Sequence, residues 1–160
     1  MTEQTKFTLE EAHQKFAILT NNGVWQLLGK SDRSSEVNEE MVITAYASLY
    51  HWLHAGTKVN AQRGHWLLAR VYTALEDAPQ ALKHATRCLD LTNRYKEEMK
   101  DFDVAYAYEA LARALALAGK SNEARQYYVK AMQAGDAIAN EEDKALFSGD
   151  LNSGKWFGIG

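Results

Sequence analysis

The most continuous apolar pattern in the chain covers residues 102–119, FDVAYAYEALARALALAG. Between Val104 and Ala118, only Glu109 and Arg113 carry a charge. A helix that is apolar around nearly its whole circumference belongs in a protein interior. The pattern therefore predicts a central, buried helix. Glu109 and Arg113 are four residues apart, which places them on one helix face where they can pair.

A first helix is predicted from about residue 8 to residue 28. Thr8 and Glu11 fit a capping box, in which each side chain accepts a hydrogen bond from the backbone of the other residue. Apolar and small residues recur at helical spacing along one face: Leu9, Ala12, Phe16, Leu19, Gly23 and Leu27. A second apolar face includes Trp25. We therefore expect this helix to pack against neighbours on two sides.

Turn and capping signals divide the rest of the chain into further helices. A polar, serine-rich connection follows the first helix, and glycines or capping residues mark the later boundaries. The predicted helices cover approximately residues 37–55, 59–75, 77–95, 102–119, 121–139 and 140–149. The last segment, residues 150–160, is rich in glycine but holds Trp156 and Phe157. We expect these two aromatic side chains to fold back onto the body.

Composition and charge restrict the class of protein. A chain of 160 residues is expected to form one domain, and abundant alanine and leucine with a single proline favour helix over strand. The net charge of −3 argues against binding to nucleic acid or to an anionic membrane. The sequence has a single cysteine, no visible signal peptide and no apolar run of membrane-spanning length, so we expect a cytoplasmic protein.

Two of the predicted helix pairs repeat one pattern of residues. In the later copy the pattern positions are Tyr108, Leu111, Ala112, Leu115, Ala124, Tyr128 and Ala131, and in the earlier copy His65, Leu68, Ala69, Tyr72, Ala81, Ala85 and Cys88. This pattern resembles the tetratricopeptide repeat (TPR) over residues 62–134. The amino-acid sequences of both segments also resemble those of small bacterial proteins described only as containing such repeats. The resemblance implies a fold and no known activity.

The implied fold is all-α, with about seven helices stacked as antiparallel hairpins in a short TPR-like superhelix. A single domain would contain an N-terminal helix pair at residues 8–58 and a first repeat at residues 59–95. The best-matching repeat would cover residues 102–139, and a cap and tail would cover residues 140–160.

The first helix of each pair lines the concave surface in TPR-like folds, so the resemblance also implies a groove. The positions in that register are Arg63, Trp66 and Arg70 from the earlier copy and Tyr106, Glu109 and Arg113 from the later copy. Three arginines and one glutamate give this wall an excess of positive charge. Arginine pairs with carboxylate or phosphate, and aromatic rings add flat apolar contact. We expect a non-enzymatic module that binds a peptide or protein segment or a small anionic ligand.

Three alternatives stay open. Glu109 and Arg113 could simply neutralise each other inside the bundle. A small enzyme or metabolite-binding protein could use arginine, glutamate and histidine in a closed pocket. The aromatic tail could instead support a homodimer or a structural partnership. Because no catalytic fingerprint is present, we predict no catalytic residue and no cofactor.

Histidines form a secondary set of candidates. His51 and His54 are three residues apart and can share a helix face, and His65 begins the earlier repeat copy. Three histidines could bind zinc, but no acidic or cysteine ligand lies at a metal-motif spacing nearby. We therefore expect partly buried histidines beside an aromatic cluster, without a metal.

Overall fold

The computed structural model describes residues 2–159, and every regular element in this range is helical. Seven α-helices follow one another: α1 (Leu9–Leu28), α2 (Ser35–Ala55), α3 (Lys58–Ala74), α4 (Ala78–Arg94), α5 (Asp101–Leu117), α6 (Ser121–Asp136) and α7 (Glu141–Leu151). A short 3-10 helix, η1 (Lys96–Glu98), connects α4 to α5. The prediction of an all-α chain with about seven helices is confirmed.

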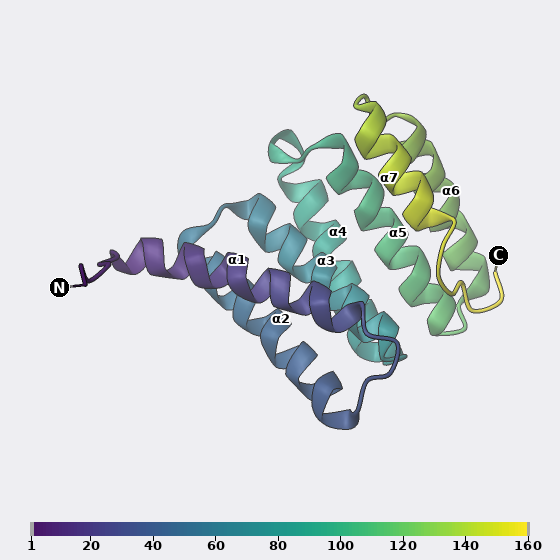
Figure 1. Ribbon diagram of the computed structural model, residues 1–160. Coiled ribbons are helices and arrows are strands. Elements are labelled where there is room, and N and C mark those ends of the chain that lie inside the picture. Colours follow the sequence, from purple (N-terminus) through teal and green to yellow (C-terminus); the bar gives the residue numbers. More distant parts are fainter. Residues whose placement is uncertain (1, 160) are drawn as a thin grey trace.

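Successive helices pair as antiparallel hairpins that stack side by side (Figure 1). α1 packs on α2, α3 on α4 and α5 on α6, and contacts of α2 with α3 and of α4 with α5 join the three hairpins. α7 packs against α5 and α6. The α1–α2 hairpin and the α6–α7 pair therefore lie at opposite ends of the stack (Figure 1). The predicted arrangement of stacked hairpins is confirmed.

Side-chain caps begin several helices at the expected residues. Thr8 and Glu11 form the reciprocal capping box: the Glu11 amide donates to the Thr8 hydroxyl over 3.1 Å, and the Thr8 amide donates to the Glu11 carboxylate over 2.8 Å. Asp77 caps α4 with a single hydrogen bond, which its carboxylate accepts from the Gln80 amide over 3.2 Å. α6 begins at Ser121, the first residue of the helix predicted over residues 121–139. Gly119 follows α5 with φ of 78°, a conformation that glycine adopts without steric cost.

α5 is the centre of the stack. Eleven of its seventeen residues are buried, and it contacts α3, α4, α6 and α7. Most of these buried residues are alanines, whose small side chains allow neighbouring helices to approach closely. The prediction of a buried central helix is confirmed. No helix within residues 2–159 combines the length and the apolar character needed to cross a lipid bilayer.

The prediction that α1 packs against neighbours on two sides holds only at its C-terminal end, where Trp25 contacts Trp66 of α3. The buried side chains of α1, including Ala17 and Val24, face α2, but Leu9, Phe16 and Leu19 are exposed. α1 and α2 form the end of the stack, so no further hairpin covers this apolar face (Figure 1). Helical spacing predicted the face correctly, but it could not show that the expected neighbour is missing from the described chain.

Candidate binding cleft

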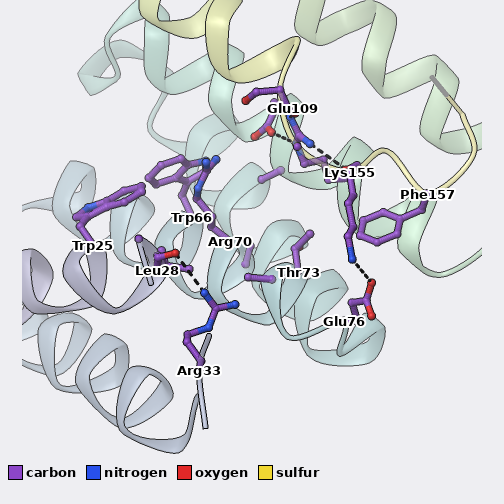
Figure 2. A pocket seen from close by; sticks show the side chains of 17 residues that line it. Trp25, Leu28, Arg33, Trp66, Arg70, Thr73, Glu76, Glu109, Lys155 and Phe157 are labelled. Carbon is purple, nitrogen blue, oxygen red and sulfur yellow. Dashed lines mark hydrogen bonds and ion pairs between the residues drawn. The ribbon is translucent and has the colours of Figure 1, made fainter. Parts of the chain in front are cut away.

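A cleft of about 540 Å³ lies between α1, α3, α5 and the C-terminal tail, residues 152–159 (Figure 2). Its charged lining residues are Arg33, Arg70, Glu76, Glu109, Arg113 and Lys155. Its large apolar lining residues are Trp25, Leu28, Trp66 and Phe157. A cleft of this size is within the range of roughly 300–1,000 Å³ that is typical of sites for small ligands.

Two tryptophans and one arginine form a wall of the cleft. The ring centres of Trp25, from α1, and Trp66, from α3, lie 5.6 Å apart. The Arg70 guanidinium lies 5.6 Å from the centre of Trp25 and 5.8 Å from that of Trp66. Within residues 2–159, no hydrogen bond or ion pair joins Arg70 to another residue. Its guanidinium donors therefore stay available to a ligand while the indoles hold its position.

Glu109 and Arg113 form a buried ion pair at the α5 side of the cleft. The Glu109 side chain is only 2% exposed, and it accepts a hydrogen bond from Nε of Arg113. Burial raises the pKa of Glu109, and the Arg113 guanidinium acts in the opposite direction by favouring the ionised carboxylate. The predicted pairing along α5 is therefore present, in a buried position that borders the cleft.

The same arginine holds the C-terminal segment against α5. Nη1 of Arg113 donates to the backbone oxygen of Lys155 over 2.9 Å, and Nη2 donates to those of Asp150 and Ser153 over 2.7 and 2.8 Å. Its guanidinium also lies 4.0 Å from the centre of the Trp156 ring. Arg113 therefore has a structural role that the sequence pattern did not reveal: it fastens the tail along one side of the cleft.

The tail brings two further groups to the cleft. Lys155 forms an ion pair with Glu76 over 3.2 Å, and Phe157 lines the cleft beside them (Figure 2). Trp156 turns away and packs edge-on against Tyr128 of α6, with ring centres 4.8 Å apart. The expectation that both tail aromatics fold back onto the body is confirmed.

The lining of the cleft carries an excess of positive charge. Four cations and two carboxylates line it, although the whole chain has a net charge of −3. Glu109 neutralises Arg113 and Glu76 neutralises Lys155, so the excess comes from Arg33 and Arg70. Arg33 donates to the backbone oxygens of Leu28 and Lys30, which fix its side chain without removing its charge.

Two of the six groove residues predicted from the repeat register lie outside the cleft lining. Arg63 binds Asp103 through two hydrogen bonds of 2.8 and 3.1 Å at the start of α5. The Tyr106 hydroxyl donates to Asp150 over 2.5 Å, and its ring packs against Phe147 of α7. Both lie one helical turn before the cleft. The four remaining predicted residues, Trp66, Arg70, Glu109 and Arg113, are brought together in the lining.

The three predicted histidines belong to two separate clusters, and neither lines the cleft. His51 and His54 lie beside His13 of α1: the Nδ1 atoms of His13 and His51 are 2.8 Å apart, and His13 stacks on His54. His65 instead pairs with His84 of α4, with their Nδ1 atoms 3.1 Å apart. Among residues 2–159, no group of three or more potential ligands has an arrangement that could hold a metal ion.

The His84 cluster extends to a tyrosine from a third helix. Nε2 of His84 lies 2.9 Å from the Tyr46 hydroxyl of α2, and the Tyr72 ring stacks on His84 with ring centres 5.7 Å apart. Burial lowers the pKa of both His65 and His84 to about 4. These histidines are therefore neutral at pH 7 and form part of the packing between α2, α3 and α4.

Several cleft residues were missed in the sequence because they lie outside the repeat. Trp25 was noted only as part of an apolar face, Arg33 belongs to a polar connection, and Lys155 lies in the tail. Each reaches the cleft through tertiary contacts, and its local sequence gives no signal of this. Only the aromatic character of the tail indicated that this segment returns to the body.

No protein-family model matches the chain, and searches of curated proteins and of solved structures found no match.

Proposed function

We propose that this protein is a binding module of stacked TPR-like hairpins whose cleft takes an anionic ligand. The ligand would be an acidic segment of a peptide or protein, or a small carboxylate or phosphate. We further propose a bacterial cytoplasmic setting, because the sequence resembles small bacterial proteins and its single cysteine, Cys88, is a buried thiol.

The observation that carries the proposal is the position of Arg70. Within residues 2–159, no carboxylate lies within hydrogen-bonding distance of the Arg70 guanidinium. The indole rings of Trp25 and Trp66 flank this guanidinium in a concave site. Arg33 adds a second positive charge to the same cleft. A carboxylate or phosphate could pair with Arg70, while a neighbouring apolar part of the ligand packs on Trp25 and Trp66.

Binding fits this cleft better than catalysis does. A general base must be within hydrogen-bond reach of the substrate, but the Glu109 side chain is only 2% exposed and already pairs with Arg113. The histidines that could act as a general acid or base belong to clusters that do not line the cleft. The cleft therefore offers groups that recognise charge and shape, without an evident acid–base pair.

The proposal can be tested by thermal unfolding in the presence of defined anions. We suggest succinate, citrate, inorganic phosphate and an acidic hexapeptide, each at millimolar concentration and at constant ionic strength. A ligand that binds only the folded protein raises its unfolding temperature, with a stabilisation of about 2.7 kcal/mol when its concentration is 100 times Kd. We expect at least one of these anions to stabilise the wild-type protein.

Arg70→Gln should abolish this stabilisation, because it removes the unbalanced cleft charge and keeps much of the side-chain length. Arg125→Gln is the matched control, since Arg125 is an exposed arginine of α6 outside the cleft. This control should respond to each anion as the wild type does. If no anion raises the unfolding temperature of Arg125→Gln more than that of Arg70→Gln, the proposal is wrong.

A further inference from the structure

We propose that the outer face of the α1–α2 hairpin binds the same face of a second copy of this chain. The proposal concerns the end of the stack and not the cleft, so it stands independently of the proposed function. In the dimer, the two hairpins would pack face to face with each helix antiparallel to its counterpart. The face is formed by the exposed side chains that point away from α3.

This outer face is strongly apolar for an exposed surface. Leu19 of α1 and Ile43 of α2 are 65% and 61% exposed, and Leu9, Phe16 and Tyr50 are also at least half exposed. One contact joins the two helices across this face: the ring centres of Phe16 of α1 and His51 of α2 lie 5.5 Å apart. Together, these five side chains expose on the order of 500 Å² of mostly apolar surface, which is the size of the largest apolar patch on a typical monomer, and patches of that size are often functional.

The spacing along both helices is that of a helix–helix seam. On α1 the face runs through Leu9, Ala12, Phe16, Leu19 and Gly23, and on α2 through Glu36, Glu40, Ile43, Ala47, Tyr50 and His54. Both series alternate steps of three and four residues, the repeat by which helices pack along one another. The seam also contains small residues at Ala12, Gly23 and Ala47, where another helix can approach closely. Another helical pair is therefore the partner that this face fits.

The order of large and small residues makes the face complementary to itself. Phe16 lies beside His51 and Gly23 beside Thr44, so the middle of the α1 seam, near Leu19, is level with Ala47 on α2. A two-fold axis can cross the helices at this level, at right angles to them. It pairs each residue with the residue of the second copy that lies equally far from the axis, in the opposite direction, along the same helix. It places Phe16 opposite Gly23 of the second copy, a large ring opposite a residue without a side chain.

The same axis also matches α2 to itself. Ala47 faces Ala47 of the second copy at the axis, and Ile43 faces the Tyr50–His51 turn of the second copy. Farther out, Glu40 faces His54 of the second copy, and both of these residues are exposed in the single chain. Apolar groups thus meet near the axis and polar groups meet near the edge. Interfaces between identical chains have this composition.

Sedimentation velocity at micromolar protein concentrations tests the association. We expect the wild-type protein to sediment with about twice the monomer mass of 18.0 kDa. Leu19→Arg should shift the protein to the monomer, because it places two opposed charges of the same sign at the axis. Leu146→Arg on α7 is the matched control, because Leu146 is 63% exposed but lies at the other end of the stack. Circular dichroism should show that both variants keep the wild-type helix content, since both side chains are exposed.

A cross-linking experiment tests the register. In Ala47→Cys, the two new thiols would meet at the two-fold axis and form a disulfide-linked dimer under mild oxidation. The native Cys88 is fully buried and should not compete. Leu146→Cys is the control and should stay largely monomeric under the same conditions.

Some results would overturn the proposal. A wild-type protein that sediments as a monomer throughout the concentration range contradicts it. So does a dimer that Leu146→Arg dissociates and Leu19→Arg leaves intact. A dimer that forms no disulfide through Ala47→Cys contradicts the proposed antiparallel register.

Discussion

The central carbon of the Arg113 guanidinium lies 4.0 Å from the ring centre of Trp156, while its nitrogens donate to Glu109 and to three backbone oxygens of the C-terminal segment. One side chain thus connects the central helix to the tail. Arg113 was predicted as a groove residue, and its buried charge also holds the C-terminal tail that forms one side of the cleft. Several consequences of this arrangement can be measured.

Glu109→Ala should destabilise the protein by about 3–5 kcal/mol, because it leaves the buried Arg113 charge without its carboxylate. The measurement is the free energy of unfolding from urea denaturation. Glu109→Gln should cost less, since its amide oxygen can still accept the Nε hydrogen bond. If Glu109→Ala changed the stability by less than about 1 kcal/mol, the pair would not be the buried structural element that its 2% exposure indicates.

Arg113→Met should release the tail. It removes the hydrogen bonds to Asp150, Ser153 and Lys155 and the contact with Trp156. We expect faster chymotryptic cleavage after Trp156 and Phe157, followed by mass spectrometry. Lys155→Met is the control, because it breaks only the exposed ion pair with Glu76, which is worth about 0–1 kcal/mol. Equal cleavage rates in the two variants would mean that Arg113 does not hold the tail.

Gly135→Ala should destabilise the packing of α6 on α7. A methyl group on Gly135 would lie 2.6 Å from Cδ1 of Phe147, a buried ring with little room to move. We expect a cost of about 1–3 kcal/mol in the free energy of unfolding. Gly149→Ala in α7 is the matched control, since no heavy atom lies within 4 Å of its new methyl group. That variant should be as stable as the wild type or gain up to about 1 kcal/mol. The reverse order of stability would contradict the packing described.

Stability should fall as the pH is lowered from about 6.5 to 4. The folded-state pKa of His65 and of His84 is about 4, below the usual value of 6.5, because burial disfavours the charged imidazole. The unfolded chain therefore binds more protons than the folded chain in this window, and acid favours unfolding. After allowance for the partial exposure of His65, we expect a loss of about 1–2 kcal/mol from the pair. Chemical denaturation at a series of pH values measures this loss, and His65→Gln should reduce its slope. The same slope in both proteins would exclude His65 as a source.

The helices could be predicted from the sequence because their signals are local. Thr8, Glu11 and Asp77 mark helix starts through contacts within one turn, and the apolar run from Val104 to Ala118 indicates a buried helix without reference to any partner. The face of α1 shows where this reasoning stops. The spacing of Phe16 and Leu19 predicts that the face is apolar, but only the position of α1 at the end of the stack shows that nothing in the described chain covers it.

The cleft was predictable only in part. The repeat register identified Trp66, Arg70, Glu109 and Arg113, because residues on one face of a helix line one surface. Arg63 follows the same register but pairs with Asp103, a partner forty residues away in the sequence. Such a partner depends on how the hairpins stack, and no local pattern contains that information.

The most direct test of the binding cleft is the response of the tryptophan indole N–H signals in an NMR titration with an anion that raises the unfolding temperature. The chain has four tryptophans, of which Trp25 and Trp66 line the cleft, whereas Trp52 of α2 and Trp156 do not. We expect the signals of Trp25 and Trp66 to move in a saturable way in the wild type and to stay unchanged in Arg70→Gln. If Trp25 and Trp66 do not respond, or if all four signals move equally in both proteins, the cleft is not the binding site.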